Sequence, residues 1–264
     1  MLITAMQPDD LSQLDLLTPE GWDNLVPHFT FNLQAPFCRP LKALLDGQIA
    51  GVGNIIYNED TAWLAQIVVH PAFRKRGIGK AITAALLEQV DRERFPTVLL
   101  DATDMGYPVY RSLGFDTITR HVHFAGPLLP EPSIPGIIPY QPAYRQAVLQ
   151  LDREATGENR EASVQAHLDH AWLYLDGDQV HGAFFPTLHR GLIVAGDPVA
   201  GRALLRLRLS CKTHAMVPEE NTEAIAALQQ LGFREQRRSR RMRQGPARPW
   251  QPGMIFNITG GALG

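Results

Sequence analysis

The chain has 264 residues, of which 45% are hydrophobic and 20% charged, a balance typical of a folded protein with one large domain or two of ordinary size. Its formal net charge of −2 gives no overall attraction to nucleic acid or to an anionic membrane, so we expect neither as a partner. The two distant cysteines, the absence of a signal-peptide pattern at the start and the lack of a long apolar run predict a cytoplasmic protein.

The first half begins with a predicted strand at 2–6 and a helix for which Asp9 or Asp10 is the candidate N-cap. Three further strands are expected, joined by tight turns into an antiparallel meander. These strands are 40–45, 49–57 and 61–69, and the turns are Asp46-Gly47 and Asn58-Glu59-Asp60.

The hydrophobic period then changes. Apolar residues recur at helical spacing from Ile78, which predicts a helix that ends before Pro96. A strand is predicted at 97–100, and a brief helix at 108–113 with Gly114 as its C-terminal cap.

A basic, glycine-rich loop joins the strand at 61–69 to this helix. The loop consists of Arg74, Lys75, Arg76, Gly77, Ile78, Gly79 and Lys80. Backbone N–H groups at a helix start, the helix dipole and the added cations suit a pyrophosphate, and glycine permits close approach. The loop lacks the Gly-Lys-Ser/Thr ending of a Walker loop and the third glycine of a dinucleotide fingerprint. A basic surface turn is the alternative interpretation.

The chain also contains an internal repeat. Leu113-Gly114-Phe115 recurs 118 residues later, at 231–233, whereas Asp46-Gly47 recurs 130 residues later, at 176–177. We therefore predict two duplicated domains, with residues lost from the second where the first carries its glycine loop. The predicted limits are 1–127 and 143–264, separated by a proline-rich linker at 128–142.

These residues resemble the GNAT superfamily of acyl-CoA N-acyltransferases. The resemblance rests on Ile67-Val68-Val69-His70-Pro71, the R/Q-x-x-G-x-G/A signature at 74–79, and the segments 98–103 and 110–115. The layout resembles a subgroup in which a catalytic GNAT domain precedes a degenerate one. It implies an α+β fold of two tandem domains, each a mixed, mostly antiparallel twisted sheet flanked by helices. It also implies N-acetyl transfer from acetyl-CoA, without a metal.

The resemblance assigns roles to particular residues. The backbone at Ile67, Val68 and Val69 would pair with the pantetheine arm, a backbone N–H near Val69 would stabilise the oxyanion, and the loop 74–80 would hold the pyrophosphate. Thr103, where many relatives carry Asn, would donate a hydrogen bond to the cofactor. Tyr110 is the predicted general acid, since a phenol of pKa about 10 can protonate a thiolate whose thiol titrates near 8.5. An ordinary core tyrosine is the alternative.

The general base is not identified, because Trp63 occupies the position of the glutamate base in some relatives. Asp101, Asp104 and His70 are candidates, each of which could be structural, and a bound water could also serve.

The second half has Leu228 at the tyrosine position and lacks the basic signature at 196–201, although Asn221 and Ala224 match the family pattern. We expect a GNAT-like fold there, without a cofactor or chemistry of its own. The arginine-rich run at 237–243 is interpreted as a solvated edge strand, with an anion site as the alternative.

The leading hypothesis is an acetyltransferase acting on a primary amine of a small molecule. The rivals are a non-catalytic acyl-CoA-binding or regulatory module and a protein or peptide N-acetyltransferase. A homodimer is compatible with the sequence.

Overall fold

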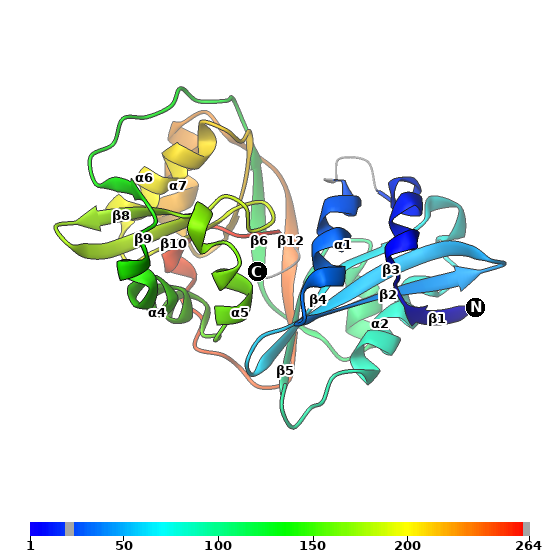
Figure 1. Ribbon diagram of the computed structural model, residues 1–264. Coiled ribbons are helices and arrows are strands. Elements are labelled where there is room, and N and C mark those ends of the chain that lie inside the picture. The colour runs from blue at the N-terminus through cyan, green and yellow to red at the C-terminus, as the bar shows by residue number, and fades with distance from the viewer. Residues whose placement is uncertain (19–23, 261–264) are drawn as a thin grey trace. The chain divides into compact units, whose positions relative to one another are not determined.

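The structure, a computed structural model, describes residues 1–18 and 24–260 (Figure 1). These residues form two compact units, each built from segments that are separate in the sequence. The first unit contains Met1–Asp116 and Met242–Pro246, and the second contains Thr117–Arg241 and Ala247–Gly260. The domain limits predicted at residues 127 and 143 refer to the repeated segments of the sequence, and they remain predictions.

The first unit is a mixed sheet with helices on both faces. Its strands are β1 (Leu2–Ala5), β2 (Cys38–Leu45), β3 (Gln48–Tyr57), β4 (Thr61–Val69) and β5 (Thr97–Ala102). Its helices are η1 (Pro8–Leu16), α1 (Leu25–Gln34), η2 (Pro71–Phe73), α2 (Ile78–Glu88) and α3 (Tyr107–Ser112). The strands lie in the order β1-β2-β3-β4-β5, and only the β4–β5 pair is parallel.

Helix α2 packs closely on β3 because two glycines leave room for it. A Cβ atom at Gly51 would lie 2.8 Å from Ile82 Cδ1, and one at Gly53 would lie 2.8 Å from Ile82 Cγ2. The apolar face of α2 that the helical spacing predicts is buried there. The position of α2, and of the loop that begins it, therefore depends on these small residues.

Helix α1 covers the opposite face of the sheet and was not predicted (Figure 1). Asn24 caps it by accepting a hydrogen bond from the Val26 N–H at 2.7 Å. The predicted N-terminal helix is also wrong in type, because η1 is a 3-10 helix whose N-cap is Gln7. Asp10 instead accepts from the Gln7 N–H at 2.7 Å and pairs with Lys42.

The second unit repeats this architecture. Its strands are β6 (Asp116–Ala125), β7 (Ile137–Pro139), β8 (Trp172–Asp176), β9 (Gln179–Phe185), β10 (Leu192–Ala195), β11 (His214–Pro218), β12 (Arg234–Gln244) and β13 (Ile255–Asn257). Its helices are η3 (Pro142–Tyr144), α4 (Arg145–Thr156), α5 (Glu161–Gln165), η4 (Leu168–His170), α6 (Pro198–Leu209), α7 (Thr222–Gln230) and η5 (Pro252–Met254). One sheet has the order β13-β10-β9-β8-β7, and β11 pairs with β6. The predicted linker thus includes β7, an edge strand where Pro139 is tolerated.

Local geometry shows which parts of the two units correspond. Gly51 lies opposite Val69 in the first unit, as Gly182 lies opposite Ala195 in the second. The His70 N–H donates to the Ala50 carbonyl in the first unit, as the Gly196 N–H donates to the His181 carbonyl in the second. Strands β3 and β4 therefore correspond to β9 and β10, and α2 corresponds to α6. The connection that precedes the helix covers residues 70–77 in the first unit and only 196–197 in the second, so the deletion lies where the sequence predicted it.

Strand β12 contributes to both units. It lies beside β6 in the second unit, while its last residues lie beside β5 in the first, where Met242 joins the core. The interpretation of the arginine run as solvated holds for Arg237 and Arg238, which are exposed, but is wrong for Ser239 and Arg241, which are buried. Charge density along a strand does not reveal which of its side chains are buried.

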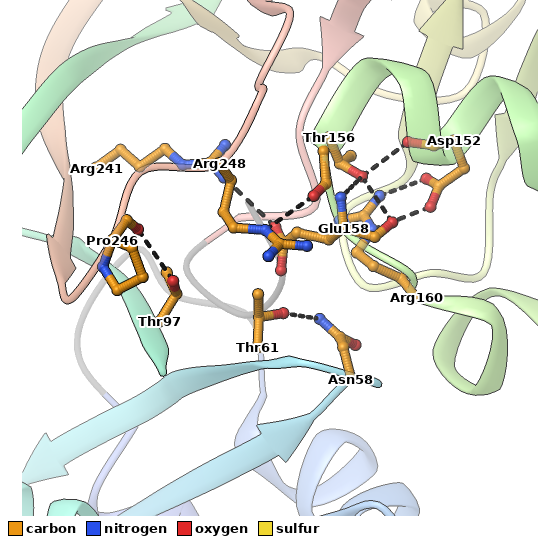
Figure 2. A network of polar contacts seen from close by, with 11 residues as sticks. Asn58, Thr61, Thr97, Asp152, Thr156, Glu158, Arg160, Arg241, Pro246 and Arg248 are labelled. Carbon is orange, nitrogen blue, oxygen red and sulfur yellow. Dashed lines mark hydrogen bonds and ion pairs between the residues drawn. The ribbon is translucent and has the colours of Figure 1, made fainter. Parts of the chain in front are cut away.

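A buried ion-pair network follows α4 in the second unit (Figure 2). Arg160 makes two hydrogen bonds to the Asp152 carboxylate, at 2.5 and 3.2 Å. Arg241 approaches Glu158 at 3.5 Å and lies over the Trp250 ring, 4.5 Å from its centroid. Buried charges are tolerated when they are paired in this way, which gives these residues a structural role. No helix among the described residues is both long and apolar enough to cross a membrane.

Candidate functional site

Strands β4 and β5 of the first unit run together only at their beginnings. Their parallel register ends where Trp63 pairs with Leu99. From Leu64 to Val69, no strand in the described part of the chain pairs with this edge of β4. Apart from the Val69 carbonyl, which accepts a hydrogen bond from Arg74 Nε, the backbone groups on this side are therefore available to an extended ligand.

A bulge lies in the open part of β4. The register with β3 shifts opposite 52–54, and Gln66 has a φ of 51°. The extra residue reverses the alternation of side chains. In a regular strand Leu64 and Val68 would lie on the same face, but here Leu64 packs on the α2 side of the sheet and Val68 on the α1 side. The bulge thereby re-aims the backbone of the three residues that follow it.

The loop after β4 leads into α2 without a side-chain cap. Gly77 is the N-cap, with a φ of 78°, and no side chain accepts a hydrogen bond from the first turn. The N–H groups of Ile78, Gly79 and Lys80 belong to this turn and have no intrahelical acceptor. The helix dipole adds partial positive charge at the same place, so an anion would be stabilised there.

The space around the loop and its charges fit an anion. A Cβ atom at Gly77 would meet no atom within 4 Å, so the N-cap faces open space. Lys75, Arg76 and Lys80 are exposed beside it. The Nε of Arg74 donates to the Val69 carbonyl at 3.2 Å and ties the loop to the end of β4, while its predicted role in binding the cofactor stays a prediction.

Thr103 shapes the turn before α3. Its hydroxyl oxygen accepts a hydrogen bond from the Gly106 N–H at 3.2 Å, and its carbonyl accepts from the Tyr107 N–H at 2.9 Å. The hydroxyl proton can still be donated to a ligand. The predicted role of Thr103 in cofactor binding therefore stays compatible with this geometry.

Tyr110 lies on α3 and is 9% exposed. Burial, and secondarily the charge of Asp101, raise the pKa of its phenol well above the ordinary value. Gly106 makes room for the ring, because a Cβ atom there would lie 2.7 Å from Tyr110 Cε2. Within the described residues the Tyr110 hydroxyl has no hydrogen-bond partner, and its oxygen is not among the fully buried polar atoms. The phenol is thus held protonated, as a proton donor requires.

Of the candidate bases, His70 has a structural task. Its Nδ1 accepts a hydrogen bond from the Ala72 N–H at 3.2 Å, and its ring lies 5.3 Å from that of Phe73. Asp101 is near enough to Tyr110 to affect the pKa of the phenol. Asp101, Asp104, His70 and a bound water remain the predicted candidates for the base. No three His, Cys, Asp or Glu side chains in the described residues are gathered as metal ligands would be.

The second unit differs at the helix start. Asp197 is the N-cap of α6, and its carboxylate accepts hydrogen bonds from the N–H groups of Val199 and Ala200 at 2.8 and 3.0 Å. These bonds, together with a contact to His181 Nδ1 at 2.8 Å, lower the pKa of Asp197 against the opposing effect of burial. The chain's own carboxylate therefore occupies the anion position that the N-terminus of α2 leaves open.

In the second unit, β13 fills the gap between β10 and β11. Ile193 and Val194 of β10 pair with β13, which reaches β11 through a hydrogen bond from the Ile258 N–H to the Met216 carbonyl at 2.9 Å. Asn257 adds a bond from the Met216 N–H at 3.0 Å and donates to two buried carbonyls. In the first unit the corresponding edge of β4 is open.

Hydrogen bonds at the next helix also show the correspondence of the two units. The Phe233 N–H donates to the Leu228 carbonyl at 2.9 Å, as the Phe115 N–H does to the Tyr110 carbonyl at 3.1 Å, so Leu228 does replace the tyrosine. Asn221 caps α7 at the position of Thr103, and its amide donates to the Ile255 carbonyl at 2.9 Å. Asn221, which binds β13, is therefore the equivalent of Thr103, the residue predicted to bind the cofactor in the first unit.

Comparison with known proteins agrees with this geometry. Two family models, each described as an acetyltransferase (GNAT) domain, match residues 38–129 and 148–257. A proposed acetyltransferase from Pyrococcus horikoshii is similar over 100% of this chain and 95% of its own, with 23% identity and a TM-score of 0.85. A GCN5-related N-acetyltransferase from Sphaerobacter thermophilus covers 95% and 96%, with 17% identity and a TM-score of 0.64. No curated protein matches significantly. The predicted family and fold class are confirmed.

Asn257→Ala should lower the free energy of unfolding by about 2–4 kcal/mol, because it leaves several buried backbone groups around β13 without partners. Urea denaturation measures this. Gln236→Ala is the matched control, since it removes an exposed side-chain bond to the Arg234 carbonyl and should change stability by less than about 0.5 kcal/mol. Equal, small effects of both substitutions would contradict the proposed importance of Asn257.

Proposed function

The chain belongs to the GNAT acetyltransferase family, with two such domains in tandem, and we propose that its first unit transfers an acetyl group from acetyl-CoA to a primary amine of a small molecule. The observation that carries this proposal is the open edge of β4, which ends at the uncapped, basic start of α2. An extended polar arm with a pyrophosphate at one end is complementary to both features.

The donor substrate would be bound mainly by backbone groups. The edge at Ile67, Val68 and Val69 would pair with the amide-containing arm, and the first turn of α2 would receive the pyrophosphate. Lys75 and Lys80 would add charge that screening by salt reduces, since both are exposed. Thr103 would donate its hydroxyl proton to the arm.

In the reaction, the amine nitrogen attacks the thioester carbonyl carbon, a C–N bond forms and the C–S bond breaks. The sulfur leaves with the electron pair, and Tyr110 supplies the proton that makes it a thiol. The raised pKa of the buried phenol makes it a weaker acid, so its proton moves only as negative charge develops on the sulfur. The amine gives up its proton to a base or a water, from which the tyrosinate is reprotonated.

The second unit would bind no acyl-CoA, because the Asp197 carboxylate and β13 occupy the two positions that a donor needs. The near-neutral net charge supports a small amine as acceptor instead of nucleic acid, and no membrane partner is proposed. The free thiols of Cys38 and Cys211 support a cytoplasmic setting.

Replacing Gly77 by Glu should abolish CoA binding, because a carboxylate at the N-cap would occupy the anion position and repel the pyrophosphate. Isothermal titration calorimetry with CoA measures this. Gly77→Gln is the matched control, since Gln has the size of Glu and meets the same positive φ without adding charge, and it should keep CoA affinity within about threefold. Unchanged affinity in the Glu variant would refute the assignment of the loop.

Tyr110→Phe should lower kcat about ten- to a thousandfold while the affinity for CoA stays nearly intact, because the phenol proton is needed only as the sulfur leaves. The assay offers a panel of amines with acetyl-CoA and detects the released thiol. Tyr107→Phe, on the same helix, should keep full activity. The raised pKa also predicts that ionisation of Tyr110 limits the wild-type rate only above pH 10.

Full activity of the Tyr110→Phe variant at every pH would show that Tyr110 is a core residue. Wild-type chain that binds acetyl-CoA but releases no thiol with any small amine would contradict the proposed acceptor. Release only with peptides would indicate a peptide N-acetyltransferase.

A further inference from the structure

A small polar cluster lies in the otherwise apolar layer between α1 and the sheet of the first unit. Asn32 of α1 is 1% exposed, and its Nδ2 donates to Gln66 Oε1 at 2.8 Å. The Asn32 carbonyl oxygen faces the Cys38 thiol at 3.8 Å. Burial raises the pKa of this thiol to about 11, so the cluster is uncharged at neutral pH. The side chain of Asn54, which is fully buried, also interacts with this thiol. Phe29 and Val68 belong to the apolar cluster on this face of the sheet.

Such a cluster needs a reason, because buried amides stabilise a fold less than apolar packing unless they fix a particular geometry. The geometry in question is that of the bulge. Gln66 has a φ of 51°, a left-handed conformation that is unfavourable for a residue with a Cβ atom. The hydrogen bond from Asn32 holds the side chain of this strained residue.

The bulge also decides which way the open edge of β4 faces. Without the extra residue, Leu64 and Val68 would lie on the same face, whereas they pack on opposite faces of the sheet. Loss of the bulge would turn the N–H and C=O groups of Ile67 and Val69 away from that edge. Acyl transfer needs such groups within a few tenths of an ångström of their places.

We propose that Asn32 and Gln66 are positioning residues for acyl transfer: their hydrogen bond ties α1 to the bulge of β4 and fixes the backbone on which the thioester lies. The inference rests on the proposed function of the first unit. It concerns a pair of side chains that touch neither donor nor acceptor but hold the strand that does.

The test compares Asn32→Ala with the exchanged pair Asn32→Gln/Gln66→Asn. The single variant should lower kcat about tenfold or more and raise KM for acetyl-CoA, because the same backbone binds the donor and aligns the thioester. It should also speed amide hydrogen exchange over residues 64–69. The exchanged pair keeps the total length of the two side chains, and Asn tolerates a positive φ, so it should restore both kcat and protection.

Asn24→Ala is the control on the same helix. It removes the cap of α1 and costs stability without touching Gln66, so kcat and exchange over 64–69 should match the wild type. An effect on kcat equal to that of Asn32→Ala, or no rescue by the exchanged pair, would overturn the inference. Wild type without acetyltransferase activity would refute the proposed function alone, and unchanged exchange in Asn32→Ala would still refute the positioning role.

Discussion

The parting of β4 from β5 after Trp63 is the constraint on which the rest of the structure depends. A strand edge in the interior of a sheet needs partners for its N–H and C=O groups, since leaving them unpaired is costly. The two units meet this need differently. The first leaves the edge open, which suits a ligand shaped like a strand, whereas the second places β13 along the edge of β10. A duplicated fold thus contains one site that can take a ligand and one filled by the chain itself.

The same contrast holds for charge. The start of α2 combines an uncapped first turn with exposed cations, which is unfavourable unless an anion binds there. The start of α6 has Asp197, whose carboxylate satisfies two N–H groups and interacts favourably with the dipole. A short connection and an acidic cap therefore remove the anion site without disturbing the packing of the helix. The second unit can therefore keep its hydrophobic core although it lacks the anion site.

The sequence predicted β4 with its observed bounds, the start of α2, the turn capped by Gly114 and the deletion in the second half, because these depend on local periodicity and on glycine positions. It could not predict α1, whose apolar face becomes informative only against the sheet. The bulge at Gln66, the division of β12 between the two units and the pairing of β13 with β10 also escaped prediction. Each depends on residues far apart in the chain, and a single sequence carries no signal for such pairings. The roles assigned to Thr103 and Tyr110 remain predictions whose geometry the structure allows.

The most direct test of this account is the number of acetyl-CoA molecules bound by one intact chain, measured by isothermal titration calorimetry and checked by native mass spectrometry. The account predicts one, bound by the first unit, because the second is filled by β13 and capped by Asp197. Two molecules per chain would contradict the filled second site, and none would contradict the function proposed for the first.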